Sequence, residues 1–176
     1  MSETHKQSVE YQLRRLVNYL RNFNEICKAL SIYFRKEVED NYGMADFYQW
    51  CSGDLLKSAD KVNGYISKIG GNTKFEDIEP PQHINYGTPV QTMEYIHKED
   101  SHLANLIQEI YNFAETNNDK DLMDFMHKEL IIPLKAWNKS FDSVLPNLRS
   151  ATPEVLSETF QRTFELMKKY RRDINV

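Results

Sequence analysis

Two short spacings in this sequence combine side chains that bind metal ions. Asp124 and His127 stand three residues apart, so a helix would place both on one face. Carboxylate and imidazole groups are common transition-metal ligands, although such a pair can equally belong to a solvated helix face. Glu94 and His97 form an E-x-x-H pair that lies off the apolar stripe of its segment, which favours a surface position. The chemistry of both pairs depends on the elements that carry them.

The two cysteines indicate a reducing environment. Cys27 and Cys51 lie in separate helical patterns and have no metal-ligand or redox spacing. We therefore expect two buried, reduced thiols rather than a disulfide, and a cytoplasmic protein. The start of the chain is polar, so we expect no signal peptide, and no apolar run is long enough to span a membrane.

Composition narrows the fold class. Only 6 Gly and 6 Pro among 176 residues argue against an all-β fold, which needs frequent turns. Apolar residues make up 40% of the chain and aromatic residues 12%, which argues against disorder. The net charge of −4 argues against general nucleic-acid binding. A mostly helical chain with one core remains.

Five segments have apolar residues at every third or fourth position, which is typical of amphipathic helices. The first spans about residues 9–35, the second follows the turn signal at 41–43 and ends at Gly70-Gly71, the third begins after Thr88-Pro89, the fourth near Asn118-Asp119, and the fifth runs from Pro153 to about residue 171. Pro133 lies within the fourth segment and should kink it, because proline removes a backbone donor.

The unequal links between these segments predict their arrangement. Short links make the first and second helices, and the third and fourth, antiparallel pairs. The link over 70–88 could extend roughly 60 Å, enough to run the length of a bundle, so the second and third helices should be parallel. We expect one domain over 1–176, with an N-terminal tail at 1–8, a crossover loop at 70–88 and a short fifth helix at 153–171.

Three stretches carry a resemblance to the ferritin family. They are Asn-Asp-Lys-Asp-Leu-Met-Asp-Phe at 118–125, Asn-Leu-Arg at 147–149, and the crossover run from Gly70-Gly71 to Pro80. The region from Met93 to Arg149 is similar to the third and fourth helices of eukaryotic ferritins without a gap. The resemblance implies an all-α, ferritin-like four-helix bundle with one long crossover and a short fifth helix.

Catalytic ferritins oxidise Fe(II) at a di-iron centre inside the bundle, and the resemblance assigns its ligand positions. Where the family pattern has Glu, Tyr, Glu, His, Glu and Gln, this chain has Leu20, Cys27, Leu55, Ser58, Asp100 and Leu134. Iron ions need oxygen donors, so we expect a packed apolar core, no di-iron centre and no enzyme activity. Asp100, as a remnant, should be a neutral carboxyl, bond to Ser58 or a water, or keep a single metal ion.

Two other ferritin features also map onto this chain. The positions of the mineral-nucleating glutamates of light-type subunits hold Trp50, Gly53, Asp54 and Lys57, which predicts poor nucleation. The acidic pair that lines the three-fold channel of ferritin shells corresponds to Asp124 and His127. The resemblance thus favours metal binding or passage at this pair where three copies converge.

The sequence therefore predicts a non-catalytic subunit of a 24-mer, ferritin-like shell that stores or binds iron. It would assemble alone or with a catalytic ferritin subunit, without nucleic acid or membrane partners. The alternative is a ferritin-fold scaffold with a structural or chaperone-like role and no iron. The stripe on the fifth helix packs with symmetry mates in a shell or folds back onto its own bundle; its members are Leu156, Phe160, Thr163 and Met167.

Overall fold

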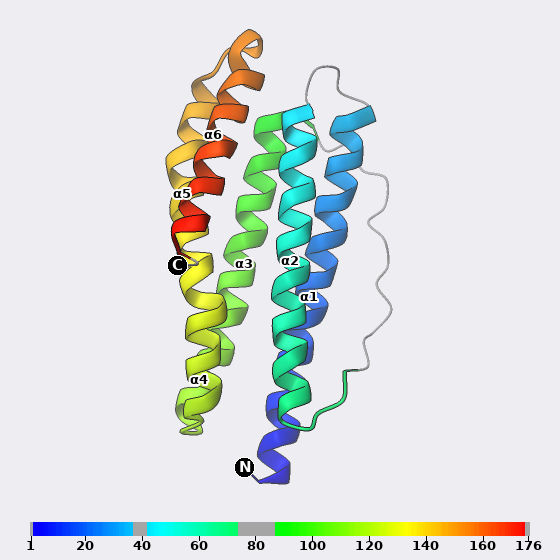
Figure 1. Ribbon diagram of the computed structural model, residues 1–176, viewed down its shortest axis with the longest axis vertical. Helices are drawn as coiled ribbons and strands as arrows, with labels where there is room; N and C mark the ends of the chain where they lie inside the picture. The colour runs from blue at the N-terminus through cyan, green and yellow to red at the C-terminus, as the bar shows by residue number, and fades with distance from the viewer. Residues whose placement is uncertain (1, 37–41, 74–86, 175–176) are drawn as a thin grey trace.

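The computed structural model describes residues 2–36, 42–73 and 87–174. Its elements are α1 (Glu3–Lys36), α2 (Tyr42–Lys68), α3 (Pro89–Thr116), α4 (Lys120–Met126), the π-helix η1 (His127–Ile131), α5 (Ile132–Ser150) and α6 (Pro153–Ile174). The elements α4, η1 and α5 follow one another without a break and form the fourth helix of a bundle (Figure 1). These described ranges contain no strand, which confirms the all-α prediction.

Both terminal helices are longer than predicted. The first helix begins at Glu3, so residues 3–8 form its first turns rather than a tail. His5 of these turns contacts Asp119, with 2.9 Å between Nε2 and Oδ2, and stacks on Phe113 at 5.8 Å, so these residues pack against the bundle. The last helix reaches Ile174 instead of residue 171, so it is not a short appendage.

The predicted ends of the helices are confirmed by their caps. Thr88 caps α3 with a reciprocal pair of hydrogen bonds to Gln91, and Pro89 occupies the first turn. At the end of α2, Gly70 has a φ of 71°, and the N–H of Gly71 donates to the carbonyl of Ile66 at 2.9 Å. Asp119 caps α4 by accepting from the N–H of Leu122 at 3.1 Å.

Pro133 has a more specific effect than the kink predicted for it. It directly follows Ile132, whose N–H donates to the carbonyl of His127, five residues earlier, and so closes the wide turn of η1. Proline cannot donate a hydrogen bond, so the chain accommodates it with one π-helical turn and continues into α5. Pro146 also lies inside α5, and the sequence analysis gave it no role.

The order of the helices matches a bundle with one crossover. In Figure 1, α2 and α3 both run from the top of the view to the bottom, so they are parallel as predicted. Most of the crossover itself, residues 74–86, lies outside the described residues.

The last helix folds back onto its own bundle. It turns after Ala151 and Thr152 and runs antiparallel along α5, with further contacts to α2 (Figure 1). Phe160 and Met167 of the predicted stripe are buried, together with Phe164. Leu156 is half-buried, and the side chain of Thr163 is outside the described part of the chain.

Candidate functional site

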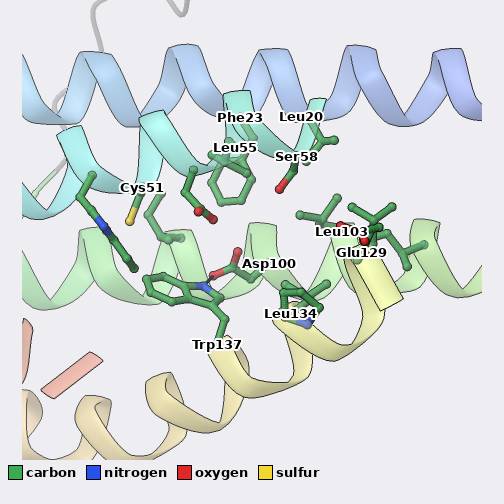
Figure 2. Close-up of a pocket in the computed structure, with 16 residues that line it drawn as sticks. Leu20, Phe23, Cys51, Leu55, Ser58, Asp100, Leu103, Glu129, Leu134 and Trp137 are labelled. Carbon is green, nitrogen blue, oxygen red and sulfur yellow. Dashed lines mark hydrogen bonds between the residues drawn. The ribbon is translucent and has the colours of Figure 1, made fainter. Parts of the chain in front are cut away.

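A cavity of about 60 Å³ lies in the middle of the bundle, between α1, α2, α3 and the fourth helix. It is lined by five of the six positions that the ferritin resemblance selected: Leu20, Leu55, Ser58, Asp100 and Leu134 (Figure 2). The sixth, Cys27, is fully buried in the surrounding core. The structure thus brings together residues that are far apart in the sequence.

Asp100 is the buried acid of this cavity. Its side chain extends from α3 toward the indole of Trp137, and the residue is only 4% exposed (Figure 2). The Nε1–H of Trp137 donates to its Oδ2 atom at 2.8 Å. The sequence predicts Ser58 or a water as the partner and does not single out Trp137. An indole on an inward stripe was the missed signal, because a buried Trp N–H needs an acceptor.

Two more carboxylates line the cavity toward solvent. Asp54 lies on α2 and Glu129 lies in the π-turn η1, and both are half-buried. Glu129 forms an ion pair with Lys61, with 2.7 Å between Oε2 and Nζ. Sequence reasoning missed Glu129, although it precedes Pro133 and Trp137 at intervals of four residues and so shares their helix face.

The other wall of the cavity is aromatic. Trp50 lies 5.4 Å from Trp137 and 5.8 Å from Phe164 of α6, measured between ring centroids. Phe47 stacks on Trp137 at 5.9 Å. Trp50 holds one of the positions compared with nucleating glutamates, and here it is part of a packed aromatic wall rather than a cation-binding face.

Cys27 and Cys51 are both buried and neither forms a disulfide, as predicted. Burial raises the pKa of the Cys27 thiol well above its usual value, and the negative charge of Asp100 raises it further. Cys51 lines the cavity. The thiols therefore act as small apolar side chains of the core.

Asp124 and His127 are exposed on the outside of the fourth helix. Asp124 lies in α4 and lines a surface groove with Lys68 and Lys128, while His127 is the first residue of η1. In the described residues, no three His, Cys, Asp or Glu side chains gather closely enough to hold a metal ion. Any metal site at this pair would therefore need ligands from other copies of the chain.

The E-x-x-H pair on α3 is engaged in contacts within the bundle. Glu94 pairs with Arg149, with 2.9 Å between Oε1 and Nε. His97 stacks on Phe141 at 5.6 Å and is half-buried rather than on the surface. These contacts explain both side chains as parts of the α3–α5 interface.

Comparison with known proteins identifies the family. The model of the Ferritin-like domain matches residues 10–151. The chain belongs to the ferritin family. Bacterial non-heme ferritin of Bacteroides fragilis is 27% identical over 101 residues, which cover 56% of this chain and 60% of that protein. Ferritin light chain 1 of Rattus norvegicus is 20% identical over 147 residues, which cover 84% of this chain and 80% of that protein. Soma ferritin of Lymnaea stagnalis is 20% identical over 126 residues, 72% of each chain.

Family membership corrects one prediction. We inferred from the six replaced positions that the chain is not an enzyme, and this is wrong, because ferritin family members are generally ferroxidases. The inference assumed that the chain could oxidise iron only with ligands at those six positions. It left out Glu129, a carboxylate that lines the same cavity.

None of the described helices combines the length and apolar character needed to cross a bilayer.

Proposed function

We propose that this ferritin-family chain is an iron-storage subunit that assembles with copies of itself into a closed shell of 24 subunits. The observation that carries the proposal is the family match over residues 10–151, which covers most of the four bundle helices. Two relatives of the chain are named as a ferritin light chain and a bacterial non-heme ferritin. Iron is the cargo of such a shell and enters as Fe(II).

Asp124 and His127 are the residues that we propose to guide metal ions into the shell. Both side chains are exposed and lie one helical turn apart. One copy offers only two ligands, but three copies around a three-fold axis would bring three carboxylates and three imidazoles together. This route requires no resident metal in the single chain.

We place the protein in the cytoplasm. Its two buried cysteines form no disulfide, which supports a reducing compartment, because disulfides form in oxidising ones. One relative of the family is named as chloroplastic, so the compartment can differ between members.

The decisive experiment combines assembly and iron loading. Purified protein is mixed with Fe(II) in air, the oxidation rate is followed by absorbance, and the product is separated by size and imaged in negative stain. We expect hollow particles with iron that co-elutes with the protein. Particles much smaller than a shell would contradict the proposed assembly. Shells that stay empty at excess iron would contradict iron storage and favour the alternative, a scaffold role without iron.

A variant pair tests the proposed metal route. Asp124→Ala with His127→Ala should slow iron uptake several-fold and leave particle size unchanged, because only the converging ligands are lost. The control replaces Asp60 and His102, an equally exposed acid and histidine on other helices, by Ala. Equal uptake by both double variants would rule out the route.

A further inference from the structure

We propose that Tyr19 of α1 and Glu99 and His102 of α3 bind a single Fe(III) ion where these two helices meet. None of the three side chains lines the central cavity, and none belongs to the metal route proposed at Asp124 and His127. The inference rests on the proposed function for the identity of the metal, because Fe(III) is the oxidised form of the iron that the shell would store.

Glu99 and His102 form a second E-x-x-H pair on α3, five residues after Glu94 and His97. In the first pair, Arg149 neutralises Glu94, with 2.9 Å between Nε and Oε1. In the second pair, Nδ1 of His102 and Oε1 of Glu99 face each other at 3.9 Å, which is longer than a hydrogen bond. Among the described residues, no lysine or arginine forms an ion pair with Glu99. The second pair is therefore not neutralised by a permanent cation as the first is.

The spacing of this second pair suits a bound metal ion. A transition metal bonds to imidazole nitrogen and carboxylate oxygen at about 2.0–2.2 Å. Two ligand atoms that lie 3.9 Å apart can therefore both contact one ion between them. Their positions three residues apart on a well-formed helix keep both side chains on one face.

Tyr19 supplies a third donor from the neighbouring helix. Its hydroxyl donates to Oε2 of Glu99 at 2.7 Å and lies 3.1 Å from the carbonyl oxygen of the same residue. The phenol is thus held beside one carboxylate oxygen, while the other oxygen faces His102. No three His, Cys, Asp or Glu side chains converge within the described residues, but with this phenol three ligand types do.

The three donors together favour Fe(III). A phenolate and a carboxylate are hard anionic oxygens, and imidazole is also a common iron ligand. Burial raises the pKa of the Tyr19 phenol above its usual value, and the hydrogen bond to Glu99 raises it further, so the phenol is protonated when no metal is bound. A trivalent ion beside the oxygen favours the anion, and the phenol proton then leaves to solvent as the Fe–O bond forms.

Such an ion can reach the site without opening the core. The side chain of His102 is 51% exposed and that of Glu99 is 19% exposed, while Tyr19 is half-buried. Water can therefore occupy the remaining coordination positions of the ion. The site should fill and empty through direct exchange with the surrounding solution.

Titration of the iron-free full chain with Fe(III) citrate at neutral pH tests the proposal. We expect a visible charge-transfer band from phenolate to Fe(III) that saturates at one ion per chain, with tyrosine vibrations enhanced in the resonance Raman spectrum. Absence of this band would overturn the site. The iron is supplied already oxidised, so failure of Fe(II) oxidation or of shell assembly would be seen in the separate loading experiment and not here.

Single variants locate the ion. Tyr19→Phe keeps the ring and should abolish the band, whereas Tyr11→Phe, at an exposed position of the same helix, should retain it. Glu99→Gln and His102→Ala should each weaken binding roughly tenfold to a hundredfold, and Glu109→Gln, at an exposed acid of α3, should bind as the wild type does. A band that survives Tyr19→Phe would overturn the assignment. Unchanged affinity in His102→Ala, an exposed position where folding is not at stake, would overturn it as well.

Discussion

The two ends of this bundle are stabilised by different kinds of interaction. At the end where α6 packs, Phe47 is fully buried and its ring contacts five other rings, those of Tyr48, Trp137, Phe141, Phe160 and Phe164. At the end formed by the turn between α3 and α4, polar contacts dominate. There Asp119 caps α4 and also contacts His5 of α1, with 2.9 Å between Oδ2 and Nε2.

The two ends also differ in how far the chain covers them. The chain covers the aromatic end with its own α6, which closes that surface and the adjacent wall of the cavity. The turn end stays open and carries a polar groove lined by Asp124 and two lysines. Apolar burial contributes several kcal/mol per side chain, whereas caps and exposed ion pairs contribute about 1 kcal/mol or less. Substitutions at the two ends should therefore differ in size and in pH dependence.

The largest effect is expected from Phe47→Ala at the aromatic end. Removing this ring leaves a cavity among five aromatic neighbours and should lower the free energy of unfolding by roughly 3–5 kcal/mol. Chemical denaturation measures the change, and Tyr11→Ala is the control, because Tyr11 is 64% exposed. A loss below about 1 kcal/mol would mean that α6 and its aromatic contacts are not formed in solution.

A smaller effect is expected from Asp119→Ala at the turn end. This change removes the cap of α4 and the contact with His5, and should cost about 1–2 kcal/mol. Asp119→Asn separates the two roles, because an amide oxygen still caps the helix while the charge beside His5 is lost. Asp121→Ala, at an exposed position in the same turn, is the control. Losses as large as that of Phe47→Ala would contradict the contrast between the ends.

The sequence predicted much of this fold because its signals are local. The caps at Thr88 and Asp119 and the end of α2 at Gly70 depend on residues within one turn of each position. The parallel α2 and α3 followed from link lengths. The π-turn before Pro133 could not be predicted from local signals. Proline only removes a hydrogen-bond donor, and the surrounding packing decides how the helix adapts.

The candidate site was predictable in its positions and not in its contacts. Leu20, Leu55 and Leu134 were placed together through the family resemblance, and they do line one cavity. The bond between Asp100 and Trp137 joins two helices at matching heights, which periodicity within one helix cannot reveal. The packing of Phe164 against Trp50 depends on how α6 folds back, a choice that its apolar stripe left open.

The smallest effect is expected at alkaline pH from Tyr65, which lies at the turn end and stacks on Phe125 at 4.5 Å. Burial, and to a smaller extent the charges of Asp119 and Asp121, together raise the pKa of Tyr65 from 10.0 to about 12. Below pH 10 both the folded and the unfolded chain keep the proton. Between pH 10 and about 12 the unfolded chain releases it first, so the free energy of unfolding should fall across this range.

Tyr65→Phe isolates this contribution, because it keeps the ring on Phe125 and removes the titrating hydroxyl. The variant should lose stability less steeply than the wild type between pH 10 and 12, by up to about one proton in the pH slope. Tyr19 and Tyr48 also have raised pKa values, so some alkaline loss should remain in the variant. Tyr11→Phe, at an exposed ring, should match the wild type. If Tyr65→Phe also matches the wild type, the phenol is not buried between α2 and α4. The solvent-exposed surface at the turn end would then extend from the groove beside Asp124 to Tyr65.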